Sequence, residues 1–327
     1  MKPTLVTGAT GFLGKHLVEL LLAQNEPLRL LCRGASPWDS RPGVEIVRGD
    51  ITDERAVSAA VEGSRRIFHL AGVVSRDPKE APKLYQVHVE GTRHLCEAAL
   101  RHNAARIVAV SSSGTIAVSK DPAVHHERSP FQKELTKNWA YYASKIEAEE
   151  LLLEYHHTRK LPVVIVNPAL ILGPGDDRNS STGDLVALLQ GQFLTYPTGG
   201  MSFIDVRDAA AATLAAMERG RVGERYLLGG ANMTFKKLIQ DACRIANRPT
   251  PWFTSSARVS LACAPLLRRL MPLIGRKFDI DDETIELSGH FWYVDAGKAA
   301  RELGLQTRDP LETLRDTIAD IRARGLA

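Results

Sequence analysis

The stretch Thr4-Leu-Val-Thr-Gly-Ala-Thr-Gly-Phe-Leu-Gly14 decides how the first half of the chain folds. A short apolar strand leads into Gly8, Gly11 and Gly14, and an apolar helix over 16–23 follows at once. The first glycine permits a tight turn, the second lets the backbone approach a pyrophosphate, and the third lets helix and strand pack closely. The pattern predicts a nucleotide-binding turn, although an ordinary turn between two elements can carry the same glycines.

The residue that meets the adenosine ribose should lie at the end of the second strand, about 20 residues after the glycine turn. The strand Leu28–Cys32 ends in Arg33, where a site that prefers NAD would carry an acidic residue. A guanidinium suits the 2′-phosphate of NADP, because it can donate two parallel hydrogen bonds. We expect NADP(H) as the cofactor. NAD(H) stays an alternative, since Arg33 could be an ordinary exposed arginine.

Composition and charge exclude several classes of protein. The 327 residues suffice for one large domain or two smaller ones, and 44% hydrophobic with 24% charged residues is typical of soluble proteins. The net charge of +4 is spread along the chain, so we expect no nucleic-acid partner. The four cysteines have neither metal nor disulfide spacing, which predicts no metal site and a reducing compartment. With no signal peptide and no apolar run of membrane-spanning length, we expect a cytoplasmic protein.

The first half of the chain alternates short strands with amphipathic helices. Strand patterns at 44–47, 66–70 and 106–111 alternate with helical patterns at 54–62 and 82–102. The alternation predicts an α/β Rossmann fold, a doubly wound parallel sheet that binds ligands at the carboxyl ends of its strands. We expect an NAD(P)-binding Rossmann domain over 1–172. The remainder, 173–327, would be mainly a smaller, interleaved substrate-binding domain, with some segments returning to the Rossmann domain.

A tyrosine and a lysine one helical turn apart supply candidate chemistry. Of the seven tyrosines, only Tyr141 has a lysine four residues later, Lys145, within a helical pattern over 140–155. The two side chains therefore share one helix face. A phenol with a pKa of about 10 is a poor acid–base group at neutral pH, but a nearby ammonium lowers that pKa. The pair predicts a proton-transfer site, unless it is one of the Tyr–Lys contacts common on helix surfaces.

Taken together, the motifs resemble those of the extended short-chain dehydrogenases/reductases, within the NAD-dependent epimerase/dehydratase superfamily. That family has a glycine-rich Rossmann domain and a Ser-Tyr-Lys active site. The matching segments follow the family's order: Thr7–Gly14, Gly49–Ile51, His69–Gly72, the serines at 111–113, Tyr141–Lys145, Asn167–Pro174, Phe203–Asp208 and Gly223–Gly229. The chain is similar to the dihydroflavonol-reductase-like, 3β-hydroxysteroid-dehydrogenase-like and hopanoid-associated epimerase-like branch.

The resemblance implies a role for each matching position. Tyr141 would be the acid–base group, Lys145 would bind the nicotinamide ribose, and Ser112, or alternatively Ser113, would orient the substrate oxygen. The implied cofactor-binding residues are Gly8, Thr10, Gly11, Phe12, Leu13, Gly14, Arg33, Asp50 and Ile51 near the adenine, Ala71 and Gly72 near the phosphates, Tyr141, Lys145, and Pro168 near the nicotinamide. His88 stands where the family usually has Asn, which leaves a proton relay or a backbone brace at this position in doubt.

The resemblance also implies hydride transfer to or from a carbonyl carbon. With Arg33, we expect an NADP(H)-dependent oxidoreductase that interconverts a ketone and a secondary alcohol. An NAD-dependent nucleotide-sugar epimerase/dehydratase is the alternative, and a non-catalytic nucleotide-binding regulator ranks below both.

Two expectations concern partners. The segment 256–277 is apolar and basic without an acidic residue. It could cover a bulky apolar small-molecule substrate, touch an anionic membrane surface peripherally, or pack as an ordinary helix with solvated arginines. The helices over 82–102 and 140–155 could build the family's usual dimer contact, so we expect a homodimer.

Overall fold

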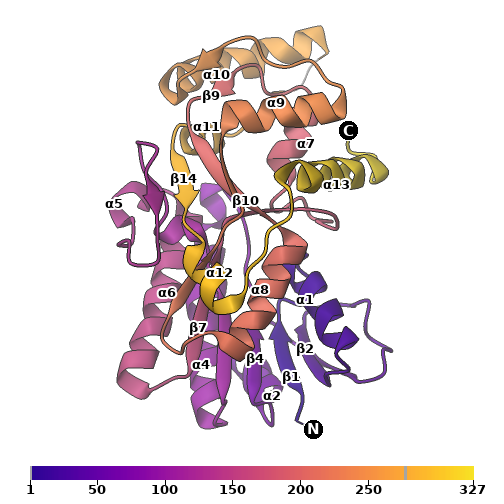
Figure 1. The fold of residues 1–327 in the computed structure, drawn as a ribbon, viewed down its shortest axis with the longest axis vertical. Helices are drawn as coiled ribbons and strands as arrows, with labels where there is room; N and C mark the ends of the chain where they lie inside the picture. The colour runs from indigo at the N-terminus through magenta and orange to yellow at the C-terminus, as the bar shows by residue number, and fades with distance from the viewer. Residues whose placement is uncertain (1, 276–277) are drawn as a thin grey trace.

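A parallel sheet of seven strands forms the lower part of the molecule in the computed structural model, which describes residues 2–275 and 278–327 (Figure 1). Its strand order is β11-β7-β5-β4-β1-β2-β3. These strands are β1 (Thr4–Thr7), β2 (Leu28–Cys32), β3 (Val44–Arg48), β4 (Arg66–His69), β5 (Arg106–Val110), β7 (Val163–Pro168) and β11 (Arg225–Leu228). The order reverses between β1 and β4, so a crevice opens at their carboxyl ends, as in other doubly wound sheets.

Helices cover both faces of this sheet. One face carries α1 (Phe12–Ala23), α8 (Val206–Arg219) and α12 (Gly297–Leu303), and the other carries α2 (Glu54–Val61), α4 (Gly91–Arg101) and α6 (Ala140–Arg159). Successive strand residues enter opposite cores: Leu5 packs on the α2, α4 and α6 side, and Val6 packs on the α1 and α8 side. Apolar runs fold as strands here because both faces are buried. The Rossmann fold expected from the sequence is confirmed.

The predicted helix over 82–102 contains a wider turn in its middle. It begins as η1 (Pro78–Glu80) and α3 (Ala81–Tyr85), opens into the π-helical turn η2 (Gln86–Glu90) and continues as α4. A π turn inserts an extra residue into a helix and often marks a functional site. Here it carries His88, whose side chain is buried.

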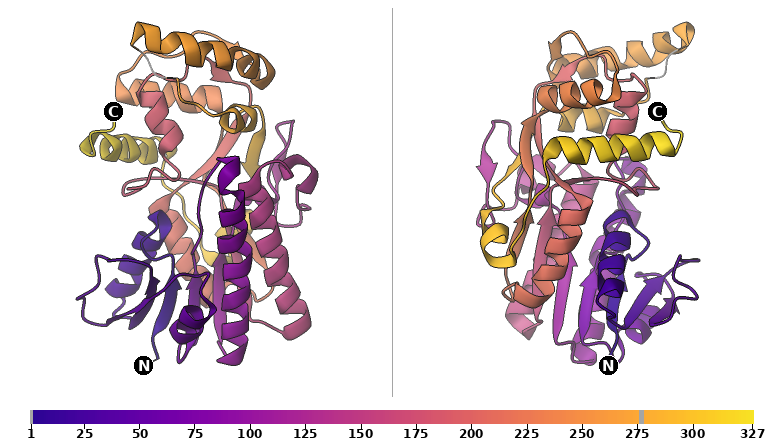
Figure 2. Two further views of the ribbon diagram at one scale, coloured as in Figure 1. Left: turned by 180° about the vertical axis from the view of Figure 1, so that it is seen from behind. Right: turned by 45° about the vertical axis from the view of Figure 1, so that its right-hand side comes forward.

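The second part of the chain forms a smaller unit above the carboxyl ends of the parallel strands (Figures 1 and 2). Its sheet has the order β12-β10-β14-β6, with β8 beside β10, and a separate pair joins β13 to β9. Its strands are β6 (Val124–His125), β8 (Leu170–Leu172), β9 (Tyr196–Pro197), β10 (Gly200–Asp205), β12 (Ala231–Thr234), β13 (Thr254–Ser255) and β14 (Phe291–Val294). Its helices are α7 (Gly183–Leu189), α9 (Phe235–Ala246), α10 (Ala257–Leu270), η4 (Met271–Ile274), α11 (Asp282–Leu287) and α13 (Pro310–Ala323), while η3 (Ser113–Thr115) and α5 (Lys133–Thr136) lie earlier in the chain.

The two parts are interleaved along the chain. Strand β11 and helices α8 and α12 come late in the sequence but belong to the Rossmann sheet, whereas β6 comes early and joins the second sheet. The segment 256–277 folds as α10 and η4, and its residues 276–277 lie outside the described residues. No helix within the described ranges has both the length and the apolar character needed to cross a membrane.

Candidate functional site

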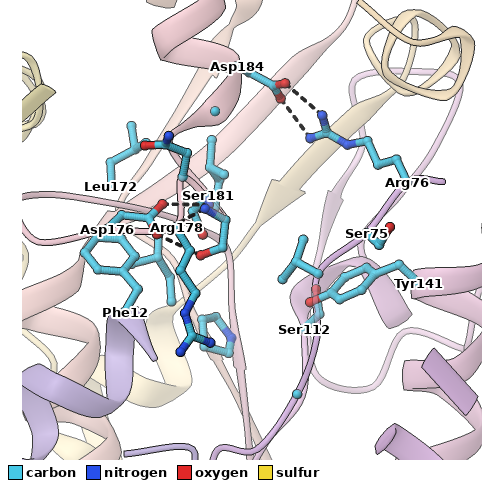
Figure 3. Close-up of a pocket in the computed structure, with 18 of the residues that line it drawn as sticks. Phe12, Ser75, Arg76, Ser112, Tyr141, Leu172, Asp176, Arg178, Ser181 and Asp184 are labelled. Atoms are coloured by element: carbon cyan, nitrogen blue, oxygen red, sulfur yellow. Dashed lines mark hydrogen bonds and ion pairs between the residues drawn. The ribbon is translucent and has the colours of Figure 1, made fainter. Parts of the chain in front are cut away.

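A cavity of about 1210 Å³ runs along the carboxyl edge of the Rossmann sheet and continues beneath the second part of the chain (Figure 3). The predicted site residues that line it are Gly8, Thr10, Gly11, Phe12, Leu13, Gly14, Arg33, Gly72, Ser112, Tyr141, Lys145 and Pro168. The alternative serine, Ser113, lines it as well. One cavity therefore joins the glycine turn to the Ser-Tyr-Lys group, which lie far apart in the sequence.

The glycine turn has the geometry that a dinucleotide requires. Gly8 has a φ of +73°, and a Cβ atom there would lie 2.5 Å from the carbonyl carbon of Leu70, so a larger residue would disrupt the turn. Helix α1 begins after Gly11, which offers no side chain to cap it, and its first turn holds no acidic residue. Its free amide groups, together with the helix dipole, suit the negative charge of a pyrophosphate.

Arg33 extends from the end of β2 toward the end of the cavity that the glycine turn lines. Its side chain is 61% exposed, and its Nη1 lies 3.5 Å from Oδ2 of Asp50. Asp50, Ile51 and Ala71 do not line the cavity: Ile51 is buried, and the backbone N–H of Ala71 donates to Oγ1 of Thr7. The adenine and phosphate contacts expected of these three residues stay predictions.

Tyr141, on the first turn of α6, faces Ser112 in the loop after β5 (Figure 3). Burial raises the pKa of Tyr141 to about 12, and a hydrogen bond with Ser112 opposes part of that rise. The expectation of a pKa lowered toward the neutral range is wrong, because the lost hydration of the phenolate outweighs the hydrogen bond with Ser112. At neutral pH Tyr141 is protonated and can donate its proton.

Lys145 lies one turn further along α6, beneath the same cavity. Its Nζ donates a hydrogen bond to the carbonyl oxygen of Val110 at 3.3 Å. Burial lowers its pKa to about 8, while the carboxylate of Glu149 acts in the opposite direction. A methyl group at Gly72 would lie 3.4 Å from this Nζ, so a glycine at 72 leaves room beside the ammonium.

His88 braces the backbone around Tyr141. Its Nε2 accepts the N–H of Val73 at 3.1 Å, so the proton of the neutral ring is on Nδ1, which donates to Oγ of Ser144 at 2.9 Å. That hydroxyl donates in turn to the carbonyl oxygen of Tyr141 at 2.9 Å. Burial, helped by the nearby Lys145, keeps the pKa of His88 well below its ordinary value. Both ring nitrogens are occupied, which supports a brace and leaves neither free for a relay.

A buried carboxylate behind Lys145 was missed by the sequence analysis. Glu149 accepts hydrogen bonds from Oγ of Ser111 at 2.6 Å and from Nδ2 of Asn167 at 2.8 Å. Its other oxygen lies 3.1 Å from Nε of Arg225, on strand β11. The signal in the sequence is a glutamate four residues after Lys145, on the inner face of α6. The contacts fix the serine loop and α6 relative to one another.

The far end of the cavity has an apolar wall and a polar edge, and the polar segment 176–181 also lines the cavity. Its apolar lining includes Leu170, Leu185, Leu188, Phe193, Met201, Phe235, Leu238, Ile239, Leu287 and Trp292. At the edge, Arg76 donates two hydrogen bonds to Asp184, at 2.7 and 2.8 Å, and one to Thr284 at 2.8 Å (Figure 3). Burial, with Asp281 nearby, raises the pKa of Glu283 to about 7. Sequence analysis identified none of these polar residues.

Metal ligands do not gather anywhere in the described part of the chain: no group of three or more His, Cys, Asp or Glu side chains there could hold a metal ion.

Comparison with known proteins agrees with this geometry. Residues 4–229 match the profile of the "NAD dependent epimerase/dehydratase family". The chain is 34% identical over 333 residues to "Sterol demethylase protein B" of Methylococcus capsulatus, with 99% of each chain covered. It is 32% identical over 324 residues to a "Putative dihydroflavonol 4-reductase" of Synechocystis, covering 96% of this chain and 92% of the other. The crystal structure of gox2253 is 29% identical and matches with a TM-score of 0.84 over 100% of this chain and 99% of that one.

The family profile spans well over half of the chain, and it includes both the glycine turn and the segment that carries Tyr141 and Lys145. The two curated relatives named above, at 34% and 32% identity, cover almost the whole sequence. The protein therefore belongs to the NAD-dependent epimerase/dehydratase family and is an NAD(P)-dependent enzyme of the extended short-chain dehydrogenase/reductase type.

Proposed function

We propose that the protein is an NADP(H)-dependent oxidoreductase that interconverts a ketone and a secondary alcohol on a bulky, apolar small molecule. The observation that carries the proposal is the position of Ser112, Tyr141 and Lys145 within one cavity. They lie between the glycine turn and the apolar far end of that cavity, which is called the chamber below. A nicotinamide bound along the turn would end beside Tyr141, and a substrate in the chamber would approach it from the other side.

The residues divide the work in a simple way. The bound cofactor supplies or accepts the hydride. In the direction of reduction, Tyr141, which burial keeps protonated, donates its proton to the carbonyl oxygen. Ser112 donates a second hydrogen bond to that oxygen and so stabilises the negative charge that develops on it. Lys145 would hold the nicotinamide ribose and place positive charge near the phenol.

The chamber's lining supports a large apolar substrate. Leucine, phenylalanine and methionine side chains from α7, α9 and β10 lie around it. Such a surface offers little to a sugar, whose hydroxyls need hydrogen-bonding partners once they leave water. The polar edge at Arg76, Asp184 and Glu283 would hold one distal polar group of the substrate.

Arg33 supports NADP(H) over NAD(H). The guanidinium stands at the end of β2, where the 2′-phosphate of NADP would lie, and it is largely exposed. Its neighbour Asp50 orients it without enclosing it. The same Asp50 favours the second candidate, an NAD-dependent nucleotide-sugar epimerase/dehydratase, because a carboxylate near this position could accept hydrogen bonds from ribose hydroxyls.

The test starts with parallel titrations of the protein with NADPH and NADH. We expect tighter binding of NADPH, and loss of that preference in Arg33→Asp. Arg41→Asp, an exposed arginine in the loop before β3, is the matched control. A panel of bulky ketones then tests turnover, with Tyr141→Phe expected to lose nearly all of it while NADPH binding persists. NAD retained through purification, with equal or tighter NADH binding, would put the epimerase first.

We also propose a homodimer and a cytoplasmic location with peripheral membrane contact. Helices α4 and α6 lie side by side on one face of the sheet, and the same pair from a second copy would complete a four-helix contact (Figure 2). Light scattering on the purified protein tests the dimer.

A further inference from the structure

An apolar stripe runs along the outer face of α10 and into η4. Val259, Leu266, Leu270 and Leu273 are 56%, 59%, 45% and 79% exposed. Their spacings of seven, four and three residues return to one face of a helix with about 3.6 residues per turn. Large apolar side chains gathered on one exposed face usually mark a contact with another surface.

The fold does not need this stripe, because the opposite face of α10 supplies its packing. Ala264 and Met271 are buried in a cluster with Phe278 and Ile285, which joins α10 to α11. Helix α11 in turn lines the substrate chamber with Thr284 and Leu287. The stripe thus lies on the far side of the helix pair that covers the chamber.

Positive charge flanks the stripe. Arg258 and Arg269 are exposed and eleven residues apart, about three helical turns, so they lie on the same side of it. Arg268 points elsewhere and binds Asp282 at 2.6 Å. The sequence 256–277 itself contains no acidic residue, and Asp282 on the adjoining helix α11 is paired with Arg268.

Two aromatic side chains precede the helix. Trp252 is 92% exposed and Phe253 is 63% exposed, just before β13. Helix α10 forms the end of the molecule furthest from the amino terminus (Figure 1). Exposed aromatic and aliphatic side chains beside arginines are the composition of segments that lie in the headgroup region of a bilayer.

We infer that this end of the molecule, defined by Trp252, Phe253, Val259, Leu266, Leu270 and Leu273 with Arg258 and Arg269, docks on an anionic lipid bilayer. The inference rests on the proposed membrane contact and names its surface and its lipid. It also agrees with the proposed substrate class, since a bulky apolar molecule partitions into membranes. Docking leaves the α10–α11 helix pair between the chamber and that reservoir.

The protein carries two native probes of the contact. Of its four tryptophans, Trp38, Trp139 and Trp292 are 5%, 2% and 2% exposed. Trp252 therefore dominates any change in tryptophan fluorescence that a partner causes. Of its four cysteines, only Cys263 is exposed, and it lies on α10 near the stripe, where a polarity-sensitive dye can be attached. The fluorescence emission of both probes should shift to shorter wavelength with vesicles of equal parts phosphatidylcholine and phosphatidylglycerol. The shift should be much smaller with phosphatidylcholine alone.

Sedimentation with the same vesicles measures the affinity. Leu266→Gln with Leu273→Gln should weaken binding about tenfold or more, since two exposed leucines that would enter the bilayer are lost. Arg258→Gln with Arg269→Gln should weaken it roughly tenfold and flatten its dependence on salt. Val124→Gln with Val222→Gln, at sites 54% and 43% exposed elsewhere, is the control and should bind normally.

Three outcomes would overturn the inference. Absence of vesicle binding would exclude a membrane contact. Normal binding by both the leucine variant and the arginine variant would mean that another surface of the molecule makes the contact. A blue shift that follows protein concentration without vesicles, and is lost in the leucine variant, would assign the stripe to a second copy of the chain. Tyr141→Phe should bind vesicles normally, and wild-type turnover of soluble ketones without vesicles tests the chemistry separately.

Discussion

Burial controls the protonation of each residue at the reacting corner of the cavity. It raises the pKa of Tyr141, and it lowers those of Lys145 and His88. All three shifts favour the neutral form, because a charge loses hydration when it is buried. At neutral pH Tyr141 and His88 are therefore uncharged, and Lys145 carries an ammonium that loses its proton more readily than an exposed lysine does.

The ammonium predicts the pH dependence of reduction. Because the pKa of Lys145 is lowered to about 8, its charged form is present below that pH and is lost above it. We expect kcat/KM for ketone reduction to be flat near neutral pH and to fall above about 8. In Lys145→Arg the charge persists to higher pH, so whatever activity remains should not fall there. An identical fall in both enzymes would assign it to another group.

The brace predicts a different signature for His88. His88→Ala leaves the N–H of Val73 without its partner and frees Ser144, so kcat should drop about tenfold and the free energy of unfolding by about 1–3 kcal/mol. The shape of the pH profile should not change, because a ring with both nitrogens occupied does not titrate in the reaction.

Two variants control the His88 experiment. His88→Asn, which keeps a donor and an acceptor, should recover part of kcat. His157→Ala, at an exposed position on α6, should be neutral. A change in the shape of the pH profile in His88→Ala would contradict the brace and favour a proton relay through His88.

At the scale of elements, the sequence predicts best where a pattern is local. The strands and helices up to β5 follow from short apolar runs and helical periodicity, and their predicted bounds differ by only a few residues from the structure. The strands of the second sheet contain two to six residues and pair with distant segments, so no local pattern identifies them. The π turn at His88, which packs against α6, has no local sequence pattern that identifies it either.

The same limit applies to the site. Tyr141, Lys145 and the glycines belong to compact motifs and could be found in the sequence. Arg76 and Asp184, which meet across the cavity, are separated by 108 positions, and neither residue type is unusual where it stands. Contacts of this kind become visible only once the fold brings the elements together.

The contacts of Glu149 predict that the packing of four segments depends strongly on one buried carboxylate. It joins α6 to the loop after β5, to β7 through Asn167 and to β11 through Arg225. Glu149→Ala leaves Arg225 without its charge partner in the interior, so we expect the free energy of unfolding in urea to fall by about 3–5 kcal/mol. Glu150→Ala, which breaks an exposed pair with Lys133, should change it by less than about 0.5 kcal/mol. Similar losses in both variants would contradict this role.

At the scale of the whole molecule, Arg76 and Asp184 connect the two parts of the chain across the cavity. Arg76 belongs to the loop after β4, Asp184 lies in the first turn of α7, and their paired hydrogen bonds fix the width of the chamber at this edge. Such two-point contacts are geometrically demanding.

Asp184→Asn should therefore raise the KM for a bulky ketone several-fold and leave the dissociation constant of NADPH unchanged, as steady-state kinetics and titration would show. Glu218→Gln, which breaks an ion pair with Arg66 away from the cavity, is the control and should alter neither constant. A weaker affinity for NADPH in Asp184→Asn would mean that the contact shapes the cofactor end instead.

The interleaved path of the chain also limits how such an enzyme can change over time. Strand β11 covers the edge of β7, so a chain cut before 225 would expose that edge and invite aggregation. The smaller unit above the Rossmann sheet is not one continuous stretch that recombination could replace. New substrate preferences must therefore arise by substitutions at individual positions around the chamber, while the nucleotide-binding turn and the proton donor stay in place.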